Sequence, residues 1–326
     1  MNPELDKPLI AITPGDPCGI GPEVVAKALA ESAPHEVCRP VVVGSCAALD
    51  SGIEVAGVDL GTRKIKNLHE AGLDPARIDV LDEGVLNPDA ITPGRVSVEC
   101  GRANGLWIAQ AADLALKGEV AASVMAPVNG EAIAAAGMAG EILGTKLSER
   151  FLTLLSGPLR VVHVYDHVPL EDVCRMVDEQ AVYLTIVKTC EALAGWGLEQ
   201  PRIGVAGINP HAHGRQEKEA IEPAVRKAQA EGIRAEGPVA PDTVFRRGIE
   251  GRYDVVIAIF HDQGHIAVKT WGFDGNCALF LGAPYLFLSV GHGTAFDIVG
   301  KGVANHQMIL SAILQAASLS SGRGFL

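Results

Sequence analysis

Short β-branched runs alternate along this chain with segments of helical period, and this alternation constrains the fold more than any other feature. Several of the β-branched runs are apolar on both faces, as a sheet covered by helices on both sides requires. The pattern predicts an α/β protein built from parallel βαβ units. Strands are predicted at 9–13, 40–43, 122–125, 202–208, 254–260 and 278–281, and helices at 22–33, 104–117, 182–194, 217–231 and 304–318.

The chain is too long for one hydrophobic core. Its 326 residues predict two α/β/α domains with a cleft between them. Because no internal repeat or long linker marks a boundary, the chain must cross between the domains inside the alternating pattern. We place residues 1–126 and 290–326 in one domain and residues 127–289 in the other.

Charge and composition exclude several classes of partner. A net charge of −12 argues against nucleic acid, whose phosphates require clustered Lys and Arg. The apolar runs are too short to span a bilayer, and the first residues lack the pattern of a signal peptide. Seven irregularly spaced cysteines do not form a disulfide framework. We therefore expect a cytoplasmic protein that acts on small molecules.

Histidines follow the ends of several apolar runs. Three imidazoles at strand ends can bind one divalent metal and leave coordination positions open for a substrate, as in a catalytic site. Ligands bind at the carboxyl ends of parallel strands, which favours a shared site for His211 and His261. His167 follows a β-branched segment and can equally be a surface histidine. The segments are Tyr165-Asp166-His167, Asn209-Pro210-His211, Phe260-His261-Asp262-Gln263-Gly264 and Gly291-His292-Gly293-Thr294.

A glycine-rich turn at 13–23 joins the first predicted strand to the first predicted helix. Pro22 suits a first helical turn, and the glycines allow a ligand to approach the backbone closely. The turn does not match the G-x-G-x-x-G fingerprint of dinucleotide-binding proteins. A structural turn and a ligand-facing loop therefore both remain open for this segment.

The segment 292–305 closely resembles the adenosine-binding loop of the isopropylmalate and isocitrate dehydrogenase superfamily. By itself it could also be a surface turn before the last helix. The resemblance implies an isopropylmalate dehydrogenase-like fold and an adenosine site at this loop. The residues that it assigns to nucleotide binding are His292, Gly293, Thr294, Ala295, Asp297 and Asn305.

Within that superfamily the chain resembles the 4-hydroxythreonine-4-phosphate dehydrogenase family of vitamin B6 biosynthesis over nearly its whole length. The resemblance implies that His167, His211 and His261 hold a divalent metal at the interface of a homodimer. It also implies NAD or NADP in the cleft, and leaves zinc, magnesium, manganese and cobalt open as the metal. The matching segments are 13–17 with 19–23, 126–129, 167–170, 209–212, 237–238, 242–245, and 261–264 followed by Lys269.

Several positions depart from the family pattern. The family's substrate-binding histidine is absent from 140–145, and Gly130, Ala278 and Phe287 replace a family lysine, asparagine and arginine. A site that has lost its polar partners is expected to change its substrate. The pattern resembles relatives that oxidise the cis-dihydrodiol of terephthalate. We therefore expect a carboxylated cis-dihydrodiol as the substrate, with 4-phosphohydroxythreonine as the alternative.

The chemistry implied by the resemblance is NAD-dependent oxidation of a β-hydroxy acid, with decarboxylation as a natural continuation. A metal would lower the pKa of the substrate hydroxyl. We expect Lys269 to orient the carboxylate or transfer a proton, and Asp242 and Asp262 to orient the ligating imidazoles. Asp242 could instead cap a helix. A non-catalytic nucleotide- or metal-binding protein is the alternative of another class.

Overall fold

The computed structural model describes residues 6–72, 74–138, 150–273 and 275–326, which divide into two compact units. The first unit comprises Met1–Thr145, Ala283–Ser321 and Leu326, and the second comprises Lys146–Gly282 and Gly322–Phe325. The chain thus passes from the first unit to the second between residues 138 and 150 and returns at 282–283, whereas the sequence analysis placed the crossings at 126–127 and 289–290. The difference arises partly because α5 (Gly130–Ala135) packs on α4 (Val98–Leu116) of the first unit.

The first unit contains a parallel sheet with the strand order β3-β4-β2-β1-β5-β12. The predicted strands at 9–13 and 122–125 are confirmed with the same bounds, and the strand predicted at 40–43 begins one residue earlier. The other three strands were not predicted from the sequence. The bounds are β1 Leu9–Thr13, β2 Arg39–Val43, β3 Gly61–Ile65, β4 Arg77–Leu81, β5 Ala122–Met125 and β12 Phe287–Val290.

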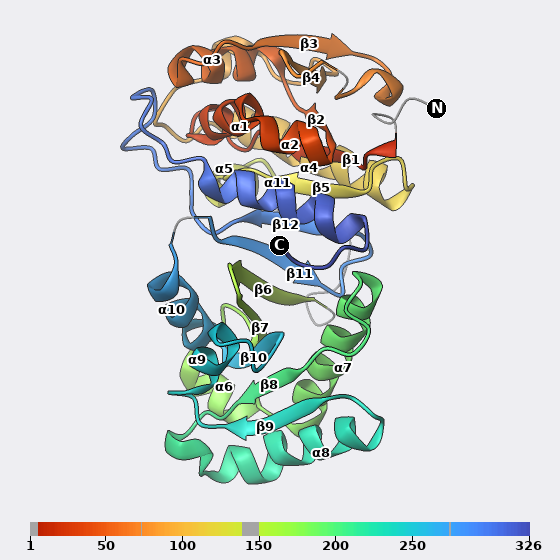
Figure 1. The fold of residues 1–326 in the computed structure, drawn as a ribbon. Coiled ribbons are helices and arrows are strands. Elements are labelled where there is room, and N and C mark those ends of the chain that lie inside the picture. The colour runs from red at the N-terminus through yellow and green to blue at the C-terminus, as the bar shows by residue number, and fades with distance from the viewer. Residues whose placement is uncertain (1–5, 73, 139–149, 274) are drawn as a thin grey trace. The chain divides into compact units, whose positions relative to one another are not determined.

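Helices cover both faces of this sheet (Figure 1). α1, α2 and α11 lie nearer the viewer than the strands, and α4 lies behind them. Trp107 of α4 is 2% exposed and belongs to a core cluster that also includes Ala11 of β1 and Val41 of β2. The remaining bounds are α1 Gly21–Ala30, α2 Ser32–Val37, α3 Cys46–Ala56 and α11 Gln307–Ser320, with short 3-10 turns at Leu68–Glu70 and Pro88–Ala90.

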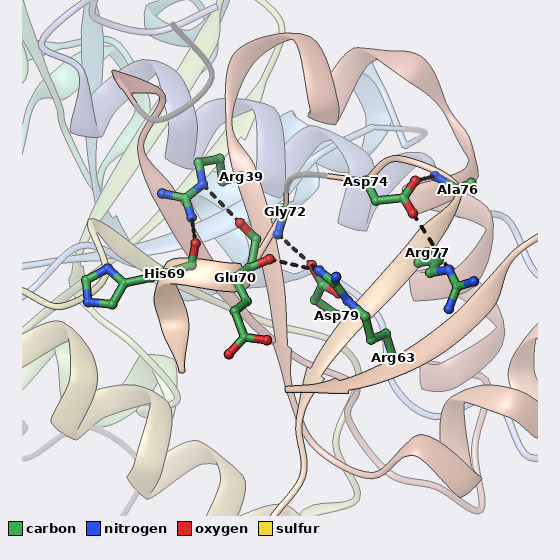
Figure 2. Close-up of polar contacts among 10 residues, drawn as sticks. Arg39, Arg63, His69, Glu70, Gly72, Asp74, Ala76, Arg77 and Asp79 are labelled. Carbon is green, nitrogen blue, oxygen red and sulfur yellow. Dashed lines mark hydrogen bonds and ion pairs between the residues drawn. The ribbon is translucent and has the colours of Figure 1, made fainter. Parts of the chain in front are cut away.

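A buried carboxylate stabilises the β3–β4 edge of the first unit (Figure 2). Asp79 of β4 accepts hydrogen bonds from Arg63 Nε at 2.6 Å, from Arg63 Nη2 at 3.0 Å and from the backbone N–H of Gly72 at 2.7 Å. The two nitrogens of Arg63 grip both carboxylate oxygens, which is the strong geometry for such a pair. The charge of Asp79, which is 2% exposed, is therefore fully compensated.

The second unit contains a mixed sheet with the strand order β11-β6-β7-β10-β8-β9. β7, β10, β8 and β9 are parallel, whereas β6 runs antiparallel to both β7 and β11. A purely parallel arrangement fails here because only two residues, Gly157 and Pro158, join β6 to β7, and parallel neighbours need a long crossover. The bounds are β6 Phe151–Ser156, β7 Leu159–Tyr165, β8 Ile203–Ala206, β9 Ala235–Val239, β10 Val255–Phe260 and β11 Cys277–Leu281.

Two helical layers flank this second sheet. α7 packs on β7 and β10 with α8 beside it, and α9 and α10 lie on the other side of the strands (Figure 1). The predicted helix at 217–231 begins as one π-helical turn, Glu217–Ile221. No helix in the described ranges combines the length and the apolar character needed to cross a membrane. The bounds are α6 Leu170–Met176, α7 Glu179–Gly195, α8 Glu222–Ala230, α9 Val244–Ile249 and α10 His261–Trp271.

Candidate functional site

Three neighbouring parallel strands of the second unit lead to the three histidines singled out in the sequence. β7 ends two residues before His167, and β10 ends directly before His261. β8 ends at Ala206, and His211 follows in a 3-10 turn. β10 pairs in parallel with both β7 and β8. All three histidines therefore follow the carboxyl ends of adjacent strands, the edge at which α/β sheets bind ligands.

His167 and His261 come together at this edge. Their ring centroids are 4.9 Å apart. With Asp166 they form a group whose potential ligand atoms all lie within 4.8 Å of one another. Two imidazole nitrogens and a carboxylate oxygen are donors that fit zinc, manganese or cobalt. The Asp166 Oδ1 atom is also buried and receives no hydrogen bond from the described residues. These residues therefore fit a divalent cation.

Each of the two imidazoles has a neighbouring aspartate at its Nδ1 atom. His167 Nδ1 lies 2.8 Å from Asp166 Oδ1, and His261 Nδ1 lies 3.3 Å from Asp262 Oδ1. The Asp262 contact has hydrogen-bond geometry, so that carboxylate can hold the proton on Nδ1 and leave Nε2 available as a ligand. Asp262 thus contacts the imidazole of His261, and its orienting role stays a prediction.

His211 is placed differently. It is exposed, adopts the left-handed conformation at φ 57°, and does not belong to the close group formed by Asp166, His167 and His261. His167 is also left-handed, at φ 49°. Such backbone is costly for a residue other than glycine and clusters at functional sites.

Glu217, which the sequence analysis did not single out, fixes the turn that carries His211. Its Oε1 accepts the backbone N–H groups of Ile208 and Asn209, both at 2.7 Å, and its Oε2 accepts the side-chain amide of Asn209 at 2.7 Å. Burial by itself would raise the pKa of Glu217, but these hydrogen bonds hold it below the ordinary value. The only signal available in the sequence was an acidic residue at the start of a predicted helix.

Two further histidines extend the cluster. His265 stacks on His261 with ring centroids 3.6 Å apart, and its Nδ1 lies 3.0 Å from the carbonyl oxygen of His261. His163 is buried, and its ring centroid lies 4.9 Å from that of His265. Its Nδ1 lies 2.9 Å from the carbonyl oxygen of Leu152. Burial, followed by electrostatic repulsion from His261, lowers the pKa of His265 to about 4, and burial lowers the pKa of His163 to about 3. Both rings are therefore neutral near pH 7, and each can donate Nδ1–H to its carbonyl.

The remaining predicted residues of the second unit are exposed. Lys269 lies in the last turn of α10, one helical turn after His265, and its charge contributes to the lowered pKa of His265. Asp242 lies in the turn before α9. Thr243 rather than Asp242 occupies the N-cap position of that helix, and it makes no side-chain capping bond. The capping alternative for Asp242 is therefore wrong.

In the first unit, the glycine-rich turn and the segment 292–305 form one structure. The backbone N–H of Ile20 donates to the carbonyl of Thr294 at 3.1 Å. A Cβ atom on Gly19 would lie 2.8 Å from the Thr294 Cβ, so this close approach requires glycine. The two segments therefore meet, although Ile20 and Thr294 are more than 270 residues apart in sequence.

Buried polar contacts hold the end of the segment 292–305. Glu23, which is 3% exposed, accepts the backbone N–H of Ala304 at 2.9 Å and forms an ion pair with Lys27 at 2.7 Å. Lys27 also donates to the carbonyl oxygens of Gly302 and Ala304, both at 2.9 Å. Helix α1 therefore fixes this segment with side chains from its first two turns.

The positions that depart from the family pattern differ in their surroundings: Ala278 and Phe287 are buried, Gly130 is exposed, and one segment is not described. Ala278 of β11 is 6% exposed and Phe287 of β12 is 1% exposed. Gly130 begins α5. The segment 140–145 lies outside the described residues. The buried environments of Ala278 and Phe287 suit apolar side chains, so these two replacements have a packing reason.

Comparison with known proteins identifies the family. The model of the family "Pyridoxal phosphate biosynthetic protein PdxA" matches residues 36–316. A protein of Novosphingobium aromaticivorans named "Putative 4-hydroxythreonine-4-phosphate dehydrogenase" is 45% identical over 320 residues, covering 98% of this chain and 97% of its own. The D-threonate 4-phosphate dehydrogenase of Cupriavidus necator is 38% identical, with 97% of this chain and 98% of its own covered.

Solved structures agree with this assignment. The 4-hydroxythreonine-4-phosphate dehydrogenase of Klebsiella pneumoniae has a TM-score of 0.87 at 36% identity, covering 96% of this chain and 100% of its own. A terephthalate 1,2-cis-dihydrodiol dehydrogenase of Burkholderia xenovorans has a TM-score of 0.68 at 31% identity, covering 96% and 98%. The chain therefore belongs to the PdxA family and is a dehydrogenase.

Proposed function

We propose that this dehydrogenase uses NAD and a divalent metal to oxidise a hydroxyl group of a phosphorylated four-carbon hydroxy acid. The substrates named in its relatives, 4-hydroxythreonine 4-phosphate and D-threonate 4-phosphate, define this class. The observation that carries the proposal is the convergence of His167 and His261 beside Asp166, at the carboxyl ends of β7 and β10.

The phosphorylated substrate is supported better than the carboxylated dihydrodiol that the sequence analysis favoured. That preference depended in part on Ala278 and Phe287, whose side chains are buried. The relatives named for phosphorylated substrates are 45% and 38% identical, against 31% for the terephthalate dihydrodiol enzyme. The dihydrodiol remains the second candidate, favoured by the loss of the family lysine at Gly130.

We assign the metal to His167, His211 and His261. His211 is exposed and lies outside the close group. We therefore assign it to a metal centre that two subunits of a homodimer share, in which His211 of one subunit joins His167 and His261 of the other. A cation bound there would lower the pKa of the substrate hydroxyl, so that its proton leaves as NAD accepts hydride. Asp262 keeps the proton of His261 on Nδ1.

Lys269 and Asp242 complete the proposed site. Both side chains are exposed on the second unit, so both are free to meet a substrate or a second subunit. We assign Lys269 to the substrate carboxylate, where it can orient the acid or return a proton if carbon dioxide is lost. We propose that Asp242 orients a ligating imidazole of the partner subunit. Its carboxylate makes no hydrogen bond with the described residues of its own chain.

The nucleotide is assigned to the loop 292–305, with His292, Gly293, Thr294, Ala295, Asp297 and Asn305 as its contacts. Thr294 packs against the glycine-rich turn that leads into α1. This supports the assignment because the backbone N–H groups of such a turn can bind the phosphates of a nucleotide. We propose NAD rather than NADP as the physiological acceptor. We expect NADP at the same concentration to support slower turnover than NAD.

The test is NADH formation by the metal-loaded protein with each candidate substrate. We expect turnover of 4-hydroxythreonine 4-phosphate or D-threonate 4-phosphate with NAD, and a fall of at least about 10²-fold in His167→Ala. His69→Ala, which changes an exposed histidine of the first unit, is the matched control and should retain activity. Turnover confined to the terephthalate dihydrodiol would support the second candidate. Binding of NAD or metal without turnover of any substrate would support the non-catalytic alternative.

A further inference from the structure

We propose that Asp166 is itself a ligand of the metal, so that the centre combines imidazole nitrogens with a carboxylate oxygen from this chain. The inference rests on the metal site proposed above and goes beyond its three histidines. Asp166 directly follows β7, and its carboxylate lies with His167 and His261 in the group whose ligand atoms are within 4.8 Å of one another.

The contact between Asp166 and His167 differs from an ordinary hydrogen bond. Asp166 Oδ1 lies 2.8 Å from His167 Nδ1, yet no N–H of the described residues is directed at this buried oxygen. A buried carboxylate oxygen without a donor is costly, and a bound cation would remove that cost. Two donor atoms about 3 Å apart are also spaced as neighbouring ligands of one metal with bonds near 2.1 Å.

Asp262 provides the internal comparison. Its carboxylate also lies beside the Nδ1 atom of a proposed ligand, at 3.3 Å from His261, but with hydrogen-bond geometry. Its side chain is 74% exposed, whereas that of Asp166 is 29% exposed. Water can solvate the Asp262 carboxylate, which therefore needs no cation. Asp262 is a positioning residue, and Asp166 is the carboxylate placed to ligate.

A ligating Asp166 changes the chemistry of the centre. A carboxylate added to the histidines suits harder divalent metals, which prefer oxygen ligands, and the centre still has positions open for a substrate. The negative charge of Asp166 also balances part of the charge of the cation. We therefore expect this protein to bind Mn²⁺ more tightly, relative to Co²⁺, than three imidazoles alone would.

The experiment compares Asp166→Asn with Asp262→Asn in the full-length protein. Calorimetry with MnCl₂ and with CoCl₂ gives the dissociation constants, and the visible spectrum of bound Co²⁺ reports its ligand field. Both replacements are isosteric, and thermal unfolding of the metal-free variants checks that the fold is retained. NADH formation by the wild-type protein, measured separately, tests the proposed function.

If Asp166 is a ligand, D166N weakens Mn²⁺ binding at least about tenfold more than Co²⁺ binding and shifts the Co²⁺ spectrum. D262N, which removes only an orienting contact, weakens both metals by a similar factor of about 10 to 100 and leaves the spectrum in place. Equal weakening of both metals by D166N with an unchanged spectrum, or no weakening at all, would overturn the inference while leaving the dehydrogenase function standing. A wild-type protein that binds neither metal would overturn both.

Discussion

Glu217 accepts two hydrogen bonds from Asn209. The backbone N–H of Asn209 donates to Oε1 and its side-chain Nδ2 donates to Oε2, both at 2.7 Å. This relationship ties the first turn of a helix to the loop that carries His211. The loop would otherwise be free to move, because it follows a short strand and includes left-handed backbone at His211 and Ala212.

Replacing Glu217 by Gln should destabilise the second unit, because the new amide cannot accept all three donors and presents an N–H to them. We expect a loss of about 1–3 kcal/mol in the free energy of unfolding, measured by urea denaturation. Glu219→Gln changes an exposed residue two positions later and serves as the control, with an expected change within about 0.5 kcal/mol. Equal stability of the two variants would contradict this role of Glu217.

The same carboxylate predicts a pH dependence. Because the pKa of Glu217 is lowered in the folded protein, its ionised form stabilises the fold above the ordinary value of 4.5. This contribution is lost as the pH falls below 4.5 and through the folded-state pKa. Unfolding measured from pH 6 down to about pH 3 should therefore show a steeper loss of stability in the wild-type protein than in Glu217→Gln. Parallel curves would count against the hydrogen-bond explanation.

Gly264→Ala should damage the histidine cluster. Replacing glycine by alanine inside a helix usually stabilises the protein by about 0.5–1 kcal/mol. At position 264, however, the new Cβ would lie 2.2 Å from Nε2 of the buried His163. We expect a net loss of about 1–3 kcal/mol on thermal unfolding and weaker metal binding, because His261 and His265 lie in the same helix. Gly195→Ala, at the end of α7 with open space around the new Cβ, should cost nothing measurable. A neutral Gly264→Ala would show that His163 can move.

Gly19→Ala should weaken nucleotide binding more than it weakens the fold. The new Cβ would meet the Cβ of Thr294 at 2.8 Å and push the two segments apart. We expect NAD affinity, measured by fluorescence titration, to fall by at least about tenfold, because close backbone approach is what positions such a loop. Gly61→Ala on β3, where a Cβ meets nothing within 4 Å, is the control. Unchanged NAD affinity in Gly19→Ala would argue against the proposed nucleotide loop.

Arg63→Ala should destabilise the first unit without touching the proposed metal site. Among the described residues, this change leaves buried Asp79 with only the N–H of Gly72 as a partner. Breaking a buried pair in this way costs on the order of 3 kcal/mol, less here to the extent that water replaces the 35% exposed arginine side chain. Arg77→Ala, whose exposed pair with Asp74 is 3.7 Å long, should change stability by less than about 0.5 kcal/mol. Figure 2 shows both pairs. A cost in Arg77→Ala equal to that in Arg63→Ala would contradict the assignment of stability to burial.

The sequence by itself determined several of the buried strands. β1 and β5 were predicted with the bounds that the structure has, because strands covered by helices on both faces are continuous apolar runs that few other structures tolerate. The same argument located His167, His211 and His261 after strand ends. The sequence did not reveal β3 and β9, because Gly61–Ile65 and Ala235–Val239 alternate with charged or turn-forming residues and lack the apolar pattern.

Only the tertiary structure decided which polar groups meet. The stacking of His265 on His261, the burial of His163 and the position of Asp166 beside His167 depend on strand order and on the antiparallel β6, neither of which follows from periodicity. The structure also showed that Ala278 and Phe287 are buried, which weakened the sequence argument for a dihydrodiol. Local patterns predict helices and strands because the spacing of apolar residues follows the backbone geometry of each element, whereas side chains from distant segments become neighbours only when the chain has folded.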